Sequence, residues 1–418
     1  HASGQSLWQI LPLNPPGVGN SPYQSVSAFA GDTGVTMGMN TFVTKNPSLK
    51  QEFWEKNKYW LDDYALYVAL KEYFQGKPWY EWPEDIKKRQ KSSIAKYRDI
   101  LRAKIEKIDD EQFIFFTEWG KIRNYAHKLG IHIMGDVPIF VSHDSADCWA
   151  HQEYFLLDED GMPELVSGVP PDYFSEDGQL WGNPLYNWRA MAQDNYEWWQ
   201  ERFAVAASLV DEVRIDHFRG FAACWGVKYG AKTAKEGKWY KGPGESLSEF
   251  VQRALPELTL IAEDLGVITE DVSKMKNDLG FSGMRLLHFG IKEREGGTVA
   301  FDTETNCYAY TGTHDNNTTV GWYTENLSDQ QQQEVCKMLG LKEKESAEDI
   351  DRKLVEYVYS RQARTVIIPM QDILALPSDC RMNTPGTATG NWQWQLTKKQ
   401  LSEAPIEWLK KLCVKYKR

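Results

Sequence analysis

The 418-residue sequence lacks the features that mark membrane, dinucleotide-binding and nucleic-acid-binding proteins. No run of 18 or more apolar residues is present, so the sequence predicts no membrane span. The net charge is −11, which argues against binding to nucleic acid or to an anionic membrane through bulk charge. No G-x-G-x-x-G follows an expected strand, and the dinucleotide-binding class therefore has no support.

Cysteines are few, and their positions fit neither a disulfide framework nor a zinc site. The six are scattered without a C-x-x-C pair or a metal-ligand spacing: Cys148, Cys224, Cys307, Cys336, Cys380 and Cys413. This usage favours buried thiols in a reducing compartment. The sequence also has no signal peptide, and we expect a cytoplasmic protein, or a plastid one in a photosynthetic eukaryote.

Aromatic residues are abundant by contrast. The chain has 17 Trp and 20 Tyr, whose flat rings with a polar edge suit contact with sugar rings or other amphipathic ligands. Many of them are also needed to fill an apolar core.

Expected strands alternate with expected helices along the chain. Strands are expected at 6–13, 131–141, within 210–220, and at 258–263, 283–289, 307–311 and 365–369. Helices are expected at 49–74, 84–107 (a pair), 110–129, 188–209, 246–254, 270–279, 329–339, 346–361 and 402–416. Such alternation predicts parallel β/α units, and the count and length favour an α/β (β/α)₈ TIM barrel over a doubly wound sheet.

We expect a single β/α barrel over residues 1–418. Large insertions at about 32–130 and 141–187 would form subdomain elements around the active-site mouth. Residues 144–187 are expected as one long loop, and such loops are usually functional. A Gly/Lys-rich loop at 226–244 is either a mobile cover or a solvated linker.

An arginine and an aspartate lie two residues apart beside the apolar Val213 and Ile215. In a strand, Arg214 and Asp216 would project from the same face, where burial is costly without a purpose. The guanidinium is expected to lower the pKa of the Asp216 carboxyl and keep it ionised, which suits a nucleophile. A structural ion pair explains this segment equally well.

Three acidic residues follow successive expected strands: Asp216, Glu263 and Asp315. In a β/α barrel those strand ends face one mouth, where active sites lie. Two carboxyls about 5 Å apart are the apparatus of a retaining glycosidase or transglycosylase, with one ionised and the other protonated. The alternative is three unrelated acids that cap the following helices.

Loop residues supply further candidates, each with an ordinary structural explanation. Asp172, after two prolines, is placed either to bind sugar hydroxyls or to form an Asx-turn. Trp181 and Tyr23 would either stack on sugar rings or fill the core. His314 either donates to a hydroxyl or is a buried histidine with its hydrogen bonds satisfied.

Ten segments in order resemble the 4-α-glucanotransferases, also called amylomaltases or disproportionating enzymes (glycoside hydrolase family 77). They are Gly4–Pro16, Asn20–Gln24, Gly135–Ile139, Gly168–Phe174, Gln179–Pro184, Arg214–Gly220, Ile261–Gly266, Thr313–Asn316, Met382–Thr387 and Asn391–Trp392. The chain departs from this family in two places. No strand and helix precede Gly4, and the segment after Gly31 is short.

The resemblance implies a barrel enzyme without metal or organic cofactor, acting on maltooligosaccharide, starch or glycogen as donor with glucose or maltooligosaccharide as acceptor. It implies Asp216 as nucleophile, Glu263 as general acid/base and Asp315 as transition-state stabiliser. It also implies glucan contacts, at the following residues: Tyr23, Asp172, Gln179, Trp181, Arg214, His314 and Asn391. An α-amylase-type hydrolase and a catalytically idle carbohydrate-binding protein remain alternatives, and the sequence does not specify the oligomeric state.

Overall fold

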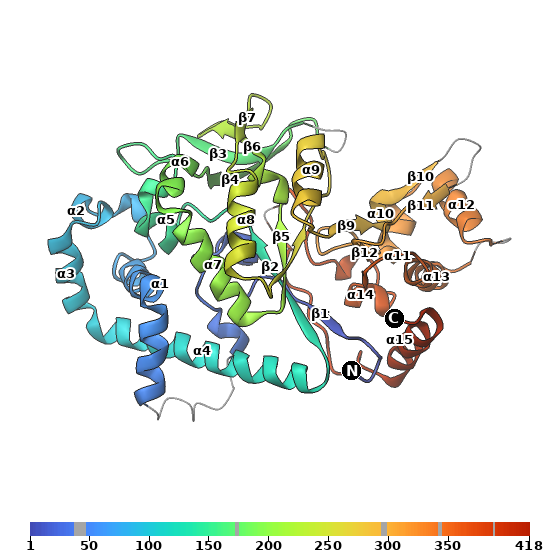
Figure 1. The fold of residues 1–418 in the computed structure, drawn as a ribbon. Helices are drawn as coiled ribbons and strands as arrows, with labels where there is room; N and C mark the ends of the chain where they lie inside the picture. The colour runs from blue at the N-terminus through green and yellow to red at the C-terminus, as the bar shows by residue number, and fades with distance from the viewer. Residues whose placement is uncertain (37–46, 172–174, 294–298, 342–344, 388) are drawn as a thin grey trace.

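The computed structural model describes residues 1–36, 47–171, 175–293, 299–341, 345–387 and 389–418 (Figure 1). Its centre is a series of seven parallel strands. Four of them pair in the order β1 (Leu7–Gln9), β2 (His132–Pro138), β5 (Glu212–Asp216) and β8 (Thr259–Ala262), and three in the order β9 (Gly283–Leu286), β12 (Cys307–Tyr310) and β13 (Thr365–Ile367). A parallel bridge between Ile261 and Ser282 links the two groups. The strands therefore follow one another in chain order, as in a β/α barrel.

Helices connect these strands. They are α7 (Glu197–Leu209), α8 (Glu245–Ala254), α9 (Glu270–Asp278), α12 (Asp329–Met338) and α13 (Ala347–Tyr359), and α15 (Glu403–Tyr416) follows the last strand. Shorter turns of helix are α10 (Leu287–Gly290), α11 (Thr319–Gly321), η9 (Trp322–Asn326), α14 (Met370–Ile373) and η10 (Ser378–Cys380). The helix α15 lies beside the start of the chain (Figure 1), where the Gln5 amide donates to Cys413 Sγ.

Strand β5 shows how the sequence divides inside from outside. Val213 and Ile215 are almost fully buried in the large apolar core between the sheet and its helices. The alternate residues Glu212, Arg214 and Asp216 share the other face, and Glu212 accepts a hydrogen bond from the Tyr308 hydroxyl of β12. Because β5 and β12 are not neighbours in the sheet order, this contact crosses the interior of the barrel.

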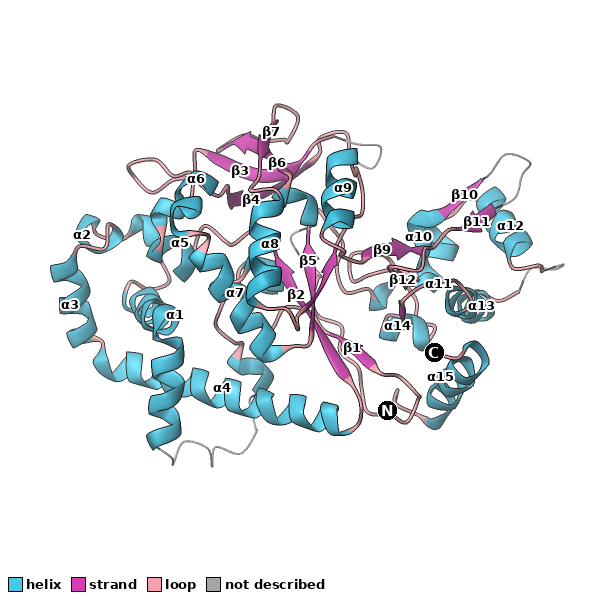
Figure 2. Cartoon of the chain, in the orientation of Figure 1, coloured by secondary structure: helices cyan, strands magenta, loops and turns pink. Residues whose placement is uncertain are grey.

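The N-terminal half adds a helical layer on one side of the strands (Figure 2). It contains α1 (Pro47–Tyr73), α2 (Glu84–Lys87), α3 (Lys91–Ile100) and α4 (Arg102–Lys128), with the short turns η1 (Val18–Asn20), η2 (Pro22–Gln24), η3 (Thr33–Thr36) and η5 (Trp79–Glu81). The long α4 begins at Arg102, not at the expected 110. The expected boundary was wrong because residues 103–109 contain no helix breaker.

The expectation of one long loop at 144–187 is wrong, and so is that of a loop at 226–244. These regions contain α5 (Ala146–Ala150), η6 (Gln152–Tyr154) and a four-stranded antiparallel sheet. Its order is β4 (Gln179–Pro184), β3 (Leu165–Val169), β6 (Ala223–Lys228) and β7 (Lys238–Lys241), and it lies beyond the ends of β2 and β5 (Figure 1). The strands are short, and β3 pairs with β6 across more than 50 residues, so local patterning could not reveal them.

The helix expected at 188–209 is interrupted. It consists of α6 (Trp188–Met191), η7 (Ala192–Asp194) and α7, separated by Asn195 and Tyr196 with φ of 58° and 60°. A further hairpin consists of β10 (Ile291–Glu293) and β11 (Val299–Phe301). No helix in the described part of the chain is long and apolar enough to cross a membrane. All six cysteines are free thiols, and four of them are buried.

Candidate active site

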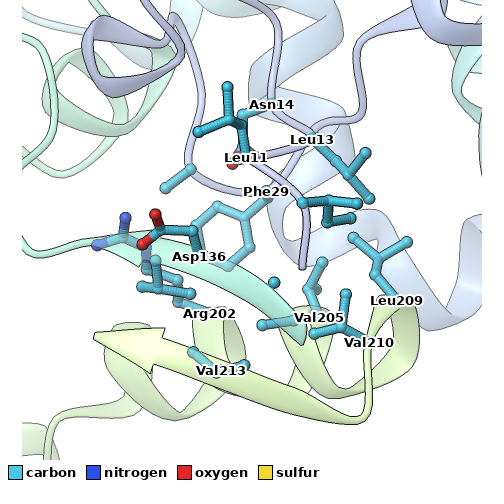
Figure 3. A pocket seen from close by; sticks show the side chains of 15 residues that line it. Leu11, Leu13, Asn14, Phe29, Asp136, Arg202, Val205, Leu209, Val210 and Val213 are labelled. Carbon is cyan, nitrogen blue, oxygen red and sulfur yellow. The ribbon is translucent and has the colours of Figure 1, made fainter. Parts of the chain in front are cut away.

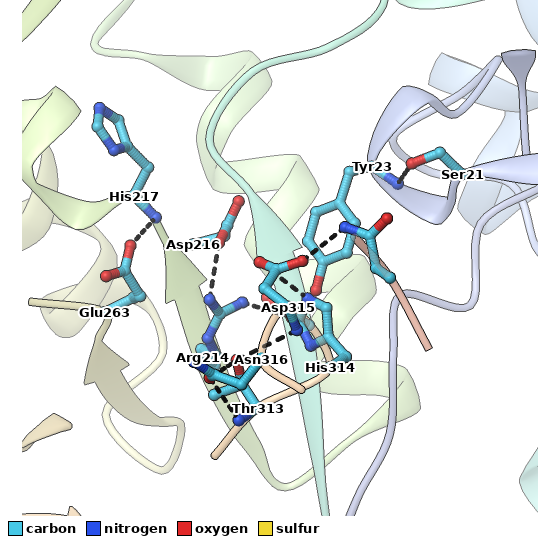
Figure 4. Close-up of polar contacts among 12 residues, drawn as sticks. Ser21, Tyr23, Arg214, Asp216, His217, Glu263, Thr313, His314, Asp315 and Asn316 are labelled. Atoms are coloured by element: carbon cyan, nitrogen blue, oxygen red, sulfur yellow. Dashed lines mark hydrogen bonds and ion pairs between the residues drawn. The ribbon is translucent and has the colours of Figure 1, made fainter. Parts of the chain in front are cut away.

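Three candidate acids lie at the carboxyl ends of β5, β8 and β12. In the parallel pairing of β5 with β8, Ile215 is opposite Ala262, so the next residues, Asp216 and Glu263, leave their strands side by side. Asp315 follows the end of β12 by five residues. The strand order thus gathers residues that are about 50 positions apart in the sequence at one edge of the sheet (Figure 4).

A buried arginine links two carboxylates at this edge. Arg214 Nη1 donates to Asp136 Oδ2 at 2.6 Å, and Arg214 Nη2 donates to Asp216 Oδ1 at 2.8 Å. The side chains of Arg214 and Asp136 are 4% and 1% exposed, whereas that of Asp216 is 28% exposed. The Tyr23 hydroxyl donates to the same Asp136 oxygen at 2.6 Å. Asp216 is therefore the open end of a hydrogen-bonded chain that starts at Tyr23.

The expected lowering of the Asp216 pKa is only one of several effects. Burial raises the pKa of Asp216 to about 6, and the carboxylates of Asp136 and Asp315 add to the rise, while Arg214 opposes it. Arg214 does lower the pKa of Asp216, as expected, but the net shift is upward. The sequence alone gave no measure of desolvation and did not reveal the contribution of Asp136.

Glu263 is held by two main-chain donors. Its Oε2 accepts from the His217 amide at 2.9 Å, and its Oε1 accepts from the Leu265 amide at 2.7 Å. His217 has a left-handed backbone, with φ of 51° and ψ of 49°. Burial raises the pKa of Glu263 to about 7, and the Asp216 charge contributes, although Arg214 and the two amides oppose the rise. Of the two neighbouring carboxyls, Asp216 therefore ionises at the lower pH and Glu263 keeps its proton to a higher pH.

Asp315 is the most open of the three acids, with 46% of its side chain exposed. Its Oδ1 accepts from Asn383 Nδ2 at 2.7 Å, and its Oδ2 lies 3.5 Å from His314 Nε2. Arg381 Nη2 donates to the Asp315 main-chain oxygen at 3.0 Å. The segment after β13 therefore fixes both the side chain and the backbone of this residue.

Aromatic rings flank the acids on two sides. Tyr23 stacks on His314 with the ring centres 5.2 Å apart, and Trp392 lies 5.8 Å from each of them. On the other side Trp181 meets the His217 ring edge-on at 4.7 Å, and Trp181 Nε1 donates to Gln179 Oε1 at 3.2 Å. Burial lowers the pKa of His217 to about 3, so its imidazole is uncharged at neutral pH.

Two other residues, Asp172 and Asn391, were predicted to contact glucan. Asp172 lies outside the described residues. Asn391 accepts from the Thr384 amide at 2.9 Å and donates to the Thr387 main-chain and side-chain oxygens at 3.0 Å. The side-chain amide of Asn391 therefore bonds to residues of its own turn.

Sequence reasoning missed several residues that the structure brings to the site. Asp136 was overlooked although, after His132, it is the one polar residue of β2, an observation that would have pointed to it. It pairs with Arg214 because these two residues are opposite in the β2–β5 register. Asn383 and Trp392 lie in segments that the family resemblance had quoted, but without a role of their own.

A small cavity is lined in part by Asp136, the carboxylate bonded to Arg214. Its other lining side chains are mostly apolar and come from the N-terminal loop, β2, β5 and α7, among them Leu13, Phe29, Val205 and Leu209 (Figure 3). Neither Asp216, Glu263 nor Asp315 lines it. As to metals, no group of three or more His, Cys, Asp or Glu side chains within the described ranges is arranged to hold an ion.

Two neighbouring carboxyls of unequal acidity lie at the strand ends of this β/α fold. This arrangement is characteristic of enzymes that act on glycosidic bonds. A profile of the family described as 4-alpha-glucanotransferase matches residues 36–401. A 4-alpha-glucanotransferase from Synechocystis sp. is 40% identical over 96% of this chain and 88% of its own, and one from Thermus thermophilus is 38% identical over 96% and 89%.

Solved structures agree with these matches. The amylomaltase from Streptococcus agalactiae in complex with acarbose superposes with a TM-score of 0.91 at 34% identity, covering 100% of this chain and 92% of that one. This chain belongs to the 4-alpha-glucanotransferase family of enzymes. Both the family inferred from the sequence motifs and the barrel fold class are confirmed.

Proposed function

We propose that this enzyme transfers α-1,4-glucan segments between maltooligosaccharides by a retaining mechanism, with Asp216 as nucleophile and Glu263 as general acid/base. The observation that carries the proposal is the pair of carboxyls at the ends of β5 and β8, whose pKa values are raised to about 6 and about 7. At a pH between these values, the reactive combination of ionised Asp216 and protonated Glu263 is well populated.

In the first step Asp216 Oδ attacks the anomeric carbon of the donor. The bond from that carbon to the leaving 4-oxygen breaks, and Glu263 gives its proton to this oxygen, which leaves as the 4-hydroxyl of the released glucan. The donor glucan is then joined to Asp216 through an ester. Since Arg214 is bonded to Asp216 Oδ1, Oδ2 is the oxygen left free to attack.

In the second step the ionised Glu263 removes the proton from the 4-hydroxyl of an acceptor sugar. The acceptor oxygen attacks the anomeric carbon, the ester bond breaks, and Asp216 recovers its negative charge. Two inversions at the same carbon retain the α configuration. The two amide donors to Glu263 hold the carboxyl in place for both proton transfers.

Asp315 would stabilise the charged transition state and bind sugar hydroxyls near the anomeric carbon. Its exposure of 46% and its fixation by Asn383 suit a carboxylate that must meet substrate without losing its position. His314, Tyr23 and Trp181 supply ring faces and polar edges beside it. The predicted contacts of Gln179 and Arg214 with glucan belong to the same proposal, as does that of Asp172.

Three further expectations accompany this proposal. Glucose or maltooligosaccharide would be the acceptor, and residues of about 32–130 and 141–187 would form the subdomain elements around the cleft. The compartment would be the cytoplasm, or a plastid in a photosynthetic eukaryote. A relative from Arabidopsis thaliana, 38% identical, is described as chloroplastic/amyloplastic.

Incubation with maltotriose alone tests the function. A transferase yields glucose and a ladder of longer oligosaccharides while the number of reducing ends stays constant. Accumulation of glucose and maltose with rising reducing ends would instead indicate a hydrolase. Asp216→Asn is the control: we expect it to retain glucan binding and to give no ladder, whereas products from this variant would refute the nucleophile role.

A further inference from the structure

A buried aspartate, Asp372, is hydrogen-bonded to both ends of the loop that carries Asp315. Asp372, in α14, is 2% exposed. Its Oδ2 accepts from the Thr311 hydroxyl at 2.5 Å and its Oδ1 accepts from the Thr319 amide at 2.8 Å. Thr311 and Thr319 are themselves fully buried. One carboxylate therefore joins the residue after β12 to the first residue of α11.

These two threonines bracket the catalytic loop. Residues 312–318 run between them and include His314 and Asp315. Within the loop, Asn316 Oδ1 accepts from both the amide and the hydroxyl of Thr313, at 2.8 and 3.0 Å. The loop is thus a compact turn whose two ends are both bonded to Asp372, so a shift of that carboxylate would move the turn as a unit.

The same stretch of chain also bonds to Asp315 directly. Arg381 and Asn383, nine and eleven residues beyond Asp372, bind the backbone and the carboxylate of Asp315. The main-chain N–H of Asn383 additionally donates to the His314 main-chain oxygen at 3.0 Å. The bonds to the two ends of the loop and those to Asp315 therefore come from one segment, 372–383, that follows β13.

A neighbouring buried acid offers a comparison. Asp351, in α13, is 0% exposed, and neither of its carboxyl oxygens has a hydrogen-bond partner among the described residues. Burial and the nearby Asp372 carboxylate raise the pKa of Asp351 well above its ordinary value, so this acid lies close to Asp372 and favours its protonated form. Within the described residues Asp351 makes no side-chain hydrogen bond to the loop. It is therefore as buried as Asp372 but lacks the contacts of Asp372.

We propose that Asp372 is a positioning residue for the reaction: by bonding Thr311 and Thr319 it sets the place of Asp315 relative to the other two acids. The inference rests on the proposed role of Asp315 in catalysis. Since a displacement of about 1 Å can lower a rate by about a hundredfold, loss of this anchor should appear in kcat.

The test compares Asp372→Asn with Asp351→Asn, two isosteric changes of buried carboxyls. An asparagine keeps one acceptor oxygen and loses the other, so we expect Asp372→Asn to lower kcat for maltotriose by about tenfold to a hundredfold with KM little changed. Asp351→Asn should leave kcat unaltered. The thermal midpoint and the near-ultraviolet circular dichroism of each variant report whether the fold is intact.

A second pair of variants removes a single bond at the other end. Thr311→Val deletes the hydroxyl and should lower kcat in the same way, whereas Thr311→Ser keeps the hydroxyl and should restore it. Full kcat in folded Asp372→Asn and Thr311→Val, or an equal loss in Asp351→Asn, would overturn the positioning role. Asp315→Asn separates the two proposals: if this variant turns over normally, the role of Asp315 itself is refuted.

Discussion

Replacing Arg214 by methionine removes the charge that joins Asp136 to Asp216 while keeping a side chain of similar length. In the parent enzyme burial opposes the charge on Arg214, but the two carboxylates raise the pKa of Arg214 above its ordinary value, so the guanidinium stays charged. Without it Asp136, with 1% of its side chain exposed, loses its ionic partner. Breaking a buried pair in this way costs about 3–5 kcal/mol of folding free energy.

The same substitution has a defined effect on activity. Arg214 lowers the pKa of both Asp216 and Glu263, so both values rise when its charge is removed. Because the reactive form needs Asp216 ionised and Glu263 protonated, the acid limb and the alkaline limb of the pH profile both move to higher pH. Activity near the parent's acid limb falls most, since Asp216 is then protonated.

The assay is a pH series of kcat/KM for maltotriose, together with urea denaturation of the same preparations. Arg214→Lys is the matched control: it keeps a positive charge but cannot form the two-pronged contact, so its pH profile should move less than that of Arg214→Met. If Arg214→Met folds with parental stability and an unmoved pH profile, the electrostatic role assigned to Arg214 is incorrect.

Three further outcomes follow from the same geometry. The parent's kcat/KM should be bell-shaped with limbs at about 6 and about 7, the values for Asp216 and Glu263; a rate that keeps rising into alkaline solution would contradict these assignments. The pKa of Glu263 is raised on folding from 4.5 to about 7, so its contribution to stability is present below 4.5 and is lost as pH rises through about 7. Relative to the parent, Glu263→Gln should therefore be more stable in alkaline than in acid solution, by about 3 kcal/mol in urea denaturation. A stability difference that does not change with pH would contradict the raised pKa of Glu263. Tyr23→Phe removes a donor to the buried Asp136 and should cost about 1–3 kcal/mol in urea denaturation, whereas Tyr80→Phe, a tyrosine remote from the acids, should cost less.

Strand ends were the part of the site that sequence could predict. Alternation along β5 placed Arg214 and Asp216 on one face, and parallel pairing placed Glu263 beside Asp216, because both rules depend on local periodicity and on strand direction. The alternation of strands and helices fixed the fold class for the same reason.

Contacts that depend on register or on distant pairing were not predictable. The Asp136–Arg214 pair needs the alignment of β2 with β5, and the antiparallel sheet needs β3 to pair with β6. The net direction of the Asp216 pKa depends on burial, which no local pattern reports. Asn391 matched a family segment, yet its amide is used within its own turn. The subdomain boundaries at 32–130 and 141–187 stay a prediction.

Trapping the covalent glycosyl-enzyme tests the central claim most directly. In Glu263→Gln the general acid/base is absent, but an α-maltosyl fluoride donor needs little acid assistance because fluoride is a good leaving group. The ester should therefore form and then persist, since no base activates the acceptor. Intact-protein mass spectrometry should show one added maltosyl group, and peptide mapping should place it on Asp216. Attachment to any other residue, or donor turnover without a trapped adduct in this variant, would contradict the account.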